Sequence, residues 1–521
     1  MFGILSDWGN RLMTRGAKLL LVPVLVLQIL FFAFLAMHRF VDGDEGQYLL
    51  ASRLVLMHKT PYLDFFYNQA PLLPYVYALW MKCTAVSWTS AKLFSALLTA
   101  LLGSLLYAHV CRQTRNWVAG LAAVVLFASS TLVFAWFPVV KPFSLAALFL
   151  FSAYVVVSRL SPTSPRWLIA AGGLLFGLSV DTRSYLLLLT PVLLWWIFQD
   201  LDTRGKLASI LWFLGGFTIA MAPCLYLFIS SPDAFLFNNL GYHALRTNAG
   251  LIGMWKEKLF AVLLFFLWDK DASNRIQDSI LFAISFAFVF SIPRRRYPPR
   301  FAFEMALAIG LISLLPTPVL PQYFCLCIPF VLLTAVCVVN DLLAELQTRR
   351  GRMVATAACV FVLGTYLAVS ANDFHRYLVT GDGVPDLQRA VDKGDWRLQR
   401  VLEVSQAIDQ IADPGEIVAS FWPGYVFQTK AIPFPGFEND FALPVSERLT
   451  SQQRARYHMV SPAEIESNFA AHVPRIVVLG NENYYMREVM RDTAKSSLRA
   501  HGYTLVRSIG DTSIYVCCAK P

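Results

Sequence analysis

The chain has 521 residues, of which 56% are hydrophobic and only 15% are charged. Soluble domains carry about 25% charged residues, so this composition excludes a soluble protein and indicates a membrane protein. The formal net charge of +10 does not indicate a nucleic-acid partner, because the basic residues cluster in short loops between apolar runs, as the membrane topology rule describes.

Apolar runs of membrane-spanning length recur along the chain, since a transmembrane helix needs about 20 mostly apolar residues. The first run, 19–37, is too long for the hydrophobic part of a signal peptide, so we expect an uncleaved first transmembrane helix. The sequence thus predicts a mainly α polytopic membrane protein with about eleven transmembrane helices. The predicted spans lie near 17–37, 91–111, 117–135, 142–159, 167–181, 184–199, 207–230, 277–292, 301–317, 321–339 and 353–371.

The basic residues of the short loops determine the predicted orientation. If the N-terminus lies in the cytoplasm and the spans alternate, every strongly basic short loop falls on the cytoplasmic side. These loops contain Arg112 and Arg115, Arg159 and Arg166, Arg204 and Lys206, Arg294 to Arg296 with Arg300, and Arg349, Arg350 and Arg352. Outside the membrane we therefore place a first loop (38–90), a second loop (231–276) and the region from 372 onward. The apolar stretches 71–88 and 251–268 are predicted to lie at the membrane interface.

The composition changes in the last part of the chain. Short β-branched runs at 416–421 and 475–479, and two further runs around a Gly-Asp turn, predict strands and a final hairpin. Helical patterns surround them, and about 150 residues suffice for a separate core. We therefore predict a transmembrane domain over 1–371 and a small extracytoplasmic α/β domain over 372–521.

The first outer loop carries an acidic pair, Asp44 and Glu45, directly after the first predicted span. Acidic residues at such a position are easily solvated, so the pair alone would indicate only a solvated loop. It opens a longer pattern, formed by Asp44, Glu45, Tyr48, Ala51, Leu54, Pro61, Tyr62, Asp64, Phe65, Gln69, Pro71, Leu72 and Tyr75. This pattern resembles the first loop of the GT-C membrane glycosyltransferases. It is most similar to the protein O-mannosyltransferases and the bacterial lipid A aminoarabinose and galacturonic acid transferases, glycosyltransferase families 39 and 83.

Two later segments extend the resemblance, more loosely, over most of the membrane region. Residues 172–189 are similar to the family's glycine-containing span that ends in a basic residue, and 321–329 to its later Tyr-Phe/Leu-Pro span. The resemblance implies a GT-C fold and a transferase that takes a sugar from a polyprenyl-phosphate donor. The sugar would pass to a hydroxyl of a glycolipid, glycan or protein acceptor at the outer membrane face. We expect a bacterial inner-membrane protein with a periplasmic C-terminal domain and undecaprenyl phosphate as the carrier.

The resemblance also implies roles for the acidic pair. Asp44 corresponds to the family's first-loop aspartate, the general base that takes the proton of the attacking hydroxyl, and a carboxylate suits that task. Glu45 would orient the acceptor or help to hold a divalent metal, should the reaction use one; no other cofactor is expected. The reaction would be a single inverting displacement, which needs no second carboxylate as a nucleophile.

Cations near the outer membrane surface are candidates to bind the donor phosphate as the sugar leaves. Arg183 lies at the outer end between two predicted spans, where a charge favours a functional role; the alternative is a snorkelling or internally paired arginine. Lys141 lies in an outer turn where many relatives carry an acidic residue, so it departs from the family pattern. His243 and Arg246 in the second outer loop complete this set. His243 equally fits a metal ligand, a partner of an acidic residue or a histidine with ordinary hydrogen bonds.

The remaining predicted contacts are with the substrates themselves. One of these residues is Asp64, for which the alternative role is to cap a helix. The partners expected from this interpretation are the polyprenyl-phosphate-linked sugar donor, the acceptor and membrane lipids. The predicted substrate-binding residues are Tyr48, Asp64, Tyr67, Gln69 and Tyr323.

Two other classes of protein compete with a glycosyltransferase. A transporter or flippase of lipid-linked glycans would place charges in the middle of its spans and show repeat symmetry between its halves. Here the conspicuous charges lie at the outer ends of spans, and no internal repeat is present. A sensor or assembly protein would leave the first-loop pattern unexplained.

Overall fold

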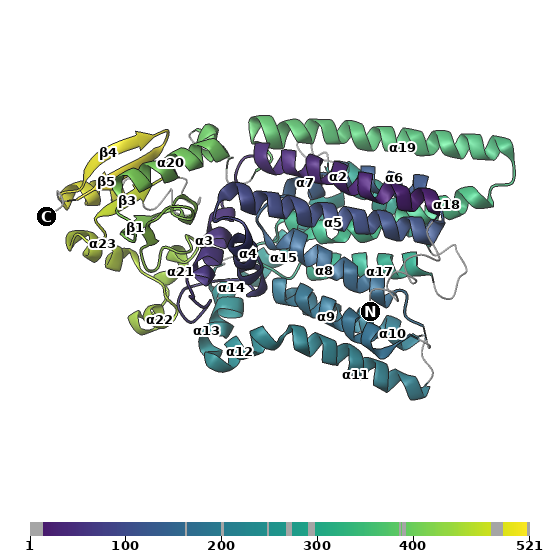
Figure 1. The fold of residues 1–521 in the computed structure, drawn as a ribbon, viewed down its shortest axis with the longest axis horizontal. Helices are drawn as coiled ribbons and strands as arrows, with labels where there is room; N and C mark the ends of the chain where they lie inside the picture. The colour runs from purple at the N-terminus through teal and green to yellow at the C-terminus, as the bar shows by residue number, and fades with distance from the viewer. Residues whose placement is uncertain are drawn as a thin grey trace.

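The structure is a computed structural model that describes residues 14–517, apart from 162–163, 200–202, 247–249, 267–273, 290–296, 385–386, 388–391 and 481–492. Long helices lie side by side in a bundle, and a small sheet lies at one end of that bundle (Figure 1). The predicted cytoplasmic run Arg294 to Arg296 lies outside the described residues.

Each predicted span corresponds to a helix or to consecutive helical segments. Side-chain caps mark several starts: Ser87 accepts a hydrogen bond from the Ser90 backbone N–H, and Asn116 accepts one from the Val118 backbone N–H. The bundle consists of α2 (Arg15–His38), α5 (Trp88–Thr114), α6 (Trp117–Ser129), α7 (Thr131–Trp136), α8 (Pro142–Val157), α9 (Arg166–Thr182), η1 (Ser184–Leu189), α10 (Thr190–Gln199), α11 (Thr203–Ala220), α12 (Ala222–Ser230), α16 (Asn274–Val289), α17 (Pro298–Ile312), η3 (Pro321–Cys327), α18 (Ile328–Glu345), α19 (Arg349–His375) and η4 (Arg376–Thr380).

Helix length and hydropathy give fewer membrane crossings than the sequence predicts. Within the described ranges, four helices are long and apolar enough to span a membrane, and α11 with α12, bent by 57° at a short break, would make a fifth. The other apolar helices have 10–17 residues, fewer than the ~20 that a perpendicular span needs. The chain is a multi-pass membrane protein, but the predicted number of eleven is not confirmed. The four helices are Arg15–His38, Trp88–Thr114, Pro321–Glu345 and Arg349–Thr380.

Helices α9 and α11 approach each other through glycines. A Cβ at Gly173 would lie 1.9 Å from the carbonyl oxygen of Phe213, and one at Gly216 would lie 1.9 Å from that of Ala170. Small residues allow helix backbones to come this close, which is a common way of packing helices in membranes. The contact holds the end of α9 in place, and Arg183 is the C-cap of that helix.

Shorter helices lie between the bundle and the sheet (Figure 1). Within the stretch 71–88, α4 has only 12 residues, too few to span a membrane. Residues 251–266 lie in one helix, α15, and the last two residues of the stretch 251–268 lie outside the described ranges. The position of both stretches at the membrane interface stays a prediction. The first loop contains α3 (Glu45–Leu56) and α4 (Leu72–Cys83), and the second contains α13 (Pro232–Leu236), η2 (Phe237–Gly241), α14 (Tyr242–Leu245) and α15 (Gly250–Phe266).

The C-terminal region forms a mixed five-stranded sheet with the order β2-β1-β3-β5-β4. The strands are β1 (Ile417–Ser420), β2 (Ile432–Pro433), β3 (Ile476–Leu479), β4 (Thr504–Ile509) and β5 (Thr512–Val516). The strand β1 pairs in parallel with β2 and β3, while β5 pairs antiparallel with β3 and β4. The predicted strands and the final hairpin are confirmed. Gly510 in the hairpin turn has a φ of 57°, which glycine adopts without strain.

The sheet and the bundle share one hydrophobic core. The amphipathic helix α20 (Leu398–Ile411) buries residues spaced by three and four positions, as a helix packed on one face does. Trp396 and Trp422 from the C-terminal region belong to the same buried cluster as Tyr48 from the first loop. The C-terminal region is therefore packed directly on the first loop. Its remaining short elements are η6 (Lys393–Trp396), η7 (Pro423–Tyr425), α21 (Leu443–Ser446), α22 (Ser451–Arg456) and α23 (Pro462–Ala470).

Candidate active site

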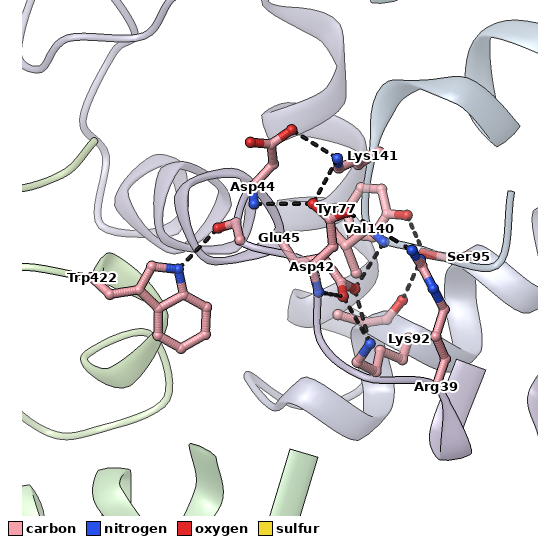
Figure 2. Close-up of polar contacts among 12 residues, drawn as sticks. Arg39, Asp42, Asp44, Glu45, Tyr77, Lys92, Ser95, Val140, Lys141 and Trp422 are labelled. Atoms are coloured by element: carbon pink, nitrogen blue, oxygen red, sulfur yellow. Dashed lines mark hydrogen bonds and ion pairs between the residues drawn. The ribbon is translucent and has the colours of Figure 1, made fainter. Parts of the chain in front are cut away.

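Asp44 lies directly before α3, a helix between the bundle and the sheet (Figure 1), and its side chain points toward Lys141 (Figure 2). Its side chain is 27% exposed, and its Oδ2 forms an ion pair with Lys141 Nζ at 2.8 Å. Its backbone N–H donates to Asp42 Oδ1 at 3.1 Å, which fixes the residue just ahead of the helix. The other carboxylate oxygen, Oδ1, has no hydrogen bond or ion pair with the described residues, so it is open to a ligand.

Glu45, its neighbour, is fully buried and fully paired (Figure 2). Lys92 Nζ lies 2.9 Å from Oε1 and 3.0 Å from Oε2. The backbone N–H of Asp42 donates to Oε1 at 2.9 Å, and that of Val140 donates to Oε2 at 3.1 Å. These four contacts use about all the lone pairs of a carboxylate. This geometry leaves Glu45 no oxygen for an acceptor or a metal; instead it ties the first loop to α5 and to the turn before α8.

A second buried carboxylate, Asp42, connects the acidic pair to two cations. Lys141 Nζ lies 2.6 Å from Asp42 Oδ1, and an Arg39 guanidinium nitrogen lies 3.8 Å from Oδ2. Burial alone would raise the pKa of Asp42, but the nearby Lys141 and Arg39 charges hold this pKa below its usual value. Arg39 makes no side-chain hydrogen bond with the described residues and lies over the rings of Trp136 and Tyr377, at 5.3 and 5.5 Å from their centroids.

Arg183 occupies a different setting, an aromatic cage without a carboxylate. The centre of its guanidinium lies 4.6 Å from the ring of Phe143, 5.0 Å from that of Tyr185 and 5.3 Å from that of Tyr323. The residue is only 7% exposed, and its buried Nε has no hydrogen-bond partner. Within the described part of the chain, no carboxylate lies at ion-pair distance from Arg183. A buried, uncompensated arginine is suited to bind an anion such as a phosphate.

Tyr48 joins the acidic pair to this cage. It is buried in α3, and burial together with the Asp44 charge raises its pKa, whereas the Arg183 and Lys141 charges act in the opposite direction. All three charges are therefore near its phenol. The structure thus brings Asp44, Tyr48, Lys141 and Arg183, which come from three separate segments, to one place.

The ring of Tyr67 lies beside that of Tyr48, with centroids 6.4 Å apart. Its backbone N–H donates to the Asn238 side chain at 3.0 Å, so the second loop positions it. Its phenol oxygen is buried and has no hydrogen-bond partner among the described residues. Buried polar atoms normally find partners, so this unpaired oxygen is a candidate to contact a ligand.

His243 and Arg246 lie at the edge of the site, against the C-terminal region. A ring nitrogen of His243, Nε2, contacts the Asn68 carbonyl oxygen at 3.1 Å. Burial lowers the pKa of His243 to about 4, so the ring is neutral at pH 7 and does not supply a charge for phosphate. Arg246 lies over the Phe441 ring, 5.1 Å from its centroid.

The other predicted substrate contacts differ in their positions. Asp64 is exposed, and its Oδ2 accepts the Thr60 backbone N–H at 2.6 Å, so it closes a turn and, in contrast to its alternative interpretation, does not cap a helix. Gln69 is half-buried and its backbone carbonyl accepts the Tyr62 hydroxyl at 2.5 Å. Tyr323 forms one wall of the Arg183 cage.

Sequence reasoning missed Lys92 and Trp422. Lys92 is a charged residue at the edge of an otherwise apolar run, which is a signal for function or pairing. Trp422 is fully buried, and its indole Nε1 donates to the Gly43 carbonyl at 2.9 Å, directly before Asp44 (Figure 2). Its sequence context favours a packed strand-to-loop junction, with contact to an acceptor glycan as the alternative, and no sequence signal links it to the first loop.

The described residues contain no group of three or more His, Cys, Asp or Glu side chains placed to hold a metal ion. No residue is therefore assigned to a metal.

Comparisons with known proteins agree with this architecture. Residues 68–228 match the family model of dolichyl-phosphate-mannose-protein mannosyltransferases. No curated protein matches the chain in sequence. ArnT from Cupriavidus metallidurans bound to undecaprenyl phosphate is 12% identical, with a TM-score of 0.65 over 97% of this chain and 98% of that chain. Its apo form is also 12% identical, with a TM-score of 0.61 over 96% and 98%.

A protein O-mannosyltransferase complex from S. cerevisiae, Pmt1-Pmt2 bound to the sugar donor, is 18% identical over 42% of this chain and 34% of that chain. Its TM-score of 0.35 is too low to support an argument about the fold. The predicted resemblance to the GT-C membrane glycosyltransferases is nevertheless confirmed, by sequence over the matched segment and by fold over almost the whole chain.

Proposed function

We propose that the chain is an inverting glycosyltransferase that moves a sugar from a polyprenyl-phosphate donor to a hydroxyl of a glycolipid, glycan or protein. One observation carries the proposal. Arg183 is a buried cation, and no carboxylate of the described ranges lies at ion-pair distance from it. It lies near Tyr48, and so does Asp44. Asp44 has one open carboxylate oxygen. A phosphate and a hydroxyl are the groups that these two side chains would bind.

The comparisons support this class of donor. The similar ArnT structure is described as bound to undecaprenyl phosphate, and the matched family is described by dolichyl-phosphate-mannose. Both names denote a phosphate on a long isoprenoid chain. We infer the same class for this chain, with undecaprenyl phosphate as the carrier in a bacterial inner membrane.

The proposed step is a single displacement. The acceptor hydroxyl oxygen forms a bond to the anomeric carbon as the bond from that carbon to the phosphate oxygen breaks. The hydroxyl proton passes to Asp44, and the polyprenyl phosphate leaves with the bonding electron pair. Arg183 opposes the negative charge that grows on the leaving phosphate, in a site where little water weakens the interaction.

The base is assigned to Asp44 rather than to its acidic neighbours because of access. Asp42 is 1% exposed and Glu45 is not exposed, whereas the Asp44 side chain is 27% exposed. Lys141 holds only one oxygen of Asp44, so the other remains free for the acceptor. In this proposal Lys141 and Glu45 position the base, and neither touches the donor.

We further propose that the site faces the outside of the membrane, with the C-terminal domain, 372–521, beside it. The predicted basic loops support this orientation, because those within the described residues lie at the ends of the helices away from the first loop. The helices α3, α4 and α14 lie at the end of the bundle that the sheet covers (Figure 1). An acceptor would therefore enter between the first loop and the C-terminal domain. The eleven predicted spans remain part of this proposal.

The test is transfer by the purified protein. Asp44→Asn should reduce transfer from undecaprenyl-phosphate-linked sugar by more than 100-fold, because an amide cannot take the proton. Asp233→Asn is the matched control: this carboxylate of the second loop is 55% exposed and forms an ion pair with Arg456, so its loss should leave full activity. Arg183→Met should weaken binding of undecaprenyl phosphate at least tenfold. Full transfer by the Asp44 variant would disprove the assignment of the base, and unchanged binding by the Arg183 variant would disprove the phosphate contact.

A further inference from the structure

A buried carboxylate near the cage, Asp181, has no role in the mechanism described above. It lies in the last turn of α9, two residues before Arg183, and is not exposed to solvent. Its Oδ1 accepts a hydrogen bond from the Cys224 thiol of α12 at 2.9 Å. Its Oδ2 is buried and has no hydrogen-bond partner, and within the described residues no cation lies at ion-pair distance from it.

Such an arrangement is unfavourable without a ligand. Burying a polar group without a hydrogen bond is costly, and a weak thiol donor satisfies only one of the two oxygens. A structural carboxylate would be paired as Glu45 is, with four donors around it. The unpaired oxygen therefore points to a ligand that supplies the missing donor.

Asp181 lies two residues before Arg183, which we propose to bind the donor phosphate, so a ligand group that pairs with the unpaired oxygen of Asp181 would lie near that phosphate. The Tyr67 phenol oxygen is likewise buried, and it has no hydrogen-bond partner among the described residues. The charges of Asp181 and Arg183 both act on the Tyr67 phenol, which agrees with this proximity. Asp181 and Tyr67 thus hold two unpaired oxygens in the neighbourhood of Arg183.

We propose that Asp181 and Tyr67 bind hydroxyl groups of the transferred sugar. The inference rests on the proposed function and adds a sugar subsite to it. Arg183 would hold the donor phosphate, and the sugar is attached directly to that phosphate, so its hydroxyls lie within reach of a neighbouring acceptor. The Asp181 carboxylate accepts a hydrogen bond from one hydroxyl, and the Tyr67 phenol donates to or accepts from another. Sites that bind substrate hydroxyls in this way discriminate strongly against ligands that lack them.

A purely structural role makes a different prediction. If Asp181 only joins α9 to α12 through Cys224, removal of the thiol should have the same effect as removal of the carboxylate. If Asp181 binds sugar, Cys224→Ala should leave sugar binding intact, because the thiol contacts the other carboxylate oxygen.

Binding of two lipids by the full-length protein in detergent separates these possibilities. The probes are undecaprenyl phosphate and undecaprenyl phosphate carrying mannose or glucose. Wild type should bind at least one sugar-linked lipid about tenfold more tightly than the bare lipid. Asp181→Asn and Tyr67→Phe should each lose most of that gain while binding bare undecaprenyl phosphate normally, and Cys224→Ala should keep the gain.

Each contrary result has a distinct meaning. A gain that survives in Asp181→Asn, or that is equally lost in Cys224→Ala, overturns the sugar subsite. A wild type that binds the bare lipid and gains nothing from either sugar also overturns it. A wild type that binds neither lipid refutes the proposed function instead, so the two failures are distinguishable. Normal binding of the bare lipid shows that each variant is folded.

Discussion

The buried pair of Glu45 and Lys92 offers a quantitative test of how the candidate base is held. Removing Lys92 by Lys92→Met leaves the Glu45 carboxylate buried with only two backbone N–H donors. Breaking a buried ion pair by removing one partner costs about 3–5 kcal/mol. The two remaining backbone donors offset part of this penalty, so we expect a loss near the lower limit, about 3 kcal/mol, in the free energy of unfolding.

The reverse change should cost more. Glu45→Gln leaves the Lys92 ammonium buried without an anion, and the new amide NH2 faces other donors. We expect a loss near the upper limit, about 5 kcal/mol. In the double variant no buried charge remains, and the glutamine oxygen still accepts one backbone N–H. One buried backbone N–H then has no acceptor, so we expect the free energy of unfolding to fall by about 1–3 kcal/mol. This loss is far below the sum of the losses in the two single variants.

Unfolding of the four proteins in mixed micelles, followed by tryptophan fluorescence, gives the required free energies. A double variant that is as unstable as the sum of the single variants would refute the reasoning, because the two charges would then not be coupled. A loss below 1 kcal/mol in both single variants would refute the burial of the pair.

Two further predictions concern residues that contact the first loop. Trp422→Phe removes the hydrogen bond to the Gly43 carbonyl and should lower the transfer rate about tenfold with unchanged donor affinity. Trp396→Phe is the control, because the Trp396 indole N–H has no partner among the described residues, and it should leave the transfer rate unchanged. Equal effects of the two changes would contradict the positioning role of Trp422. Burial lowers the pKa of His243 to about 4 in the folded chain, whereas the ordinary pKa of histidine, about 6.5, applies to the unfolded chain. Between these two values only the unfolded chain binds a proton at this position. The free energy of unfolding should therefore decrease as the pH falls from about 6.5 to 4. His243→Gln should remove that part of the pH dependence in unfolding titrations, and an unchanged profile would contradict it.

Much of the fold could be predicted because local patterns determine it. Apolar runs gave a helical segment for every predicted span, and β-branched runs around a Gly-Asp turn gave the final hairpin. The number of crossings could not be obtained in the same way. The run 117–135 breaks at Ser130, within a Ser-Ser-Thr triplet, and the run 207–230 bends at Met221, two residues before Pro223. Such residues are also tolerated inside continuous transmembrane helices, so their presence does not by itself predict an interruption. Tertiary packing decides such breaks.

The site was predictable only where its residues are close in sequence. Asp44 and Tyr48 lie one helical turn apart on α3, and the pattern of the first loop identified both. The pairing of Lys92 with Glu45, and of Lys141 with Asp42 and Asp44, joins segments that are about 50 to 100 residues apart. Hydropathy and spacing carry no information on which distant charges meet. Glu45 consequently stood out as a candidate for chemistry, although the geometry gives it a holding role.

The balance of charges in the site explains why a single arginine stands out. Three carboxylates, Asp42, Asp44 and Glu45, meet three cations, which are Arg39, Lys92 and Lys141. This cluster is close to neutral, so it neither attracts nor repels a phosphate strongly. Had the turn before α8 carried an acidic residue in place of Lys141, the cluster would carry four carboxylates against two cations and would repel the donor. With Lys141 present, the cluster stays close to neutral, and Arg183, which forms no ion pair with a carboxylate of the described residues, can pair with the phosphate of the donor.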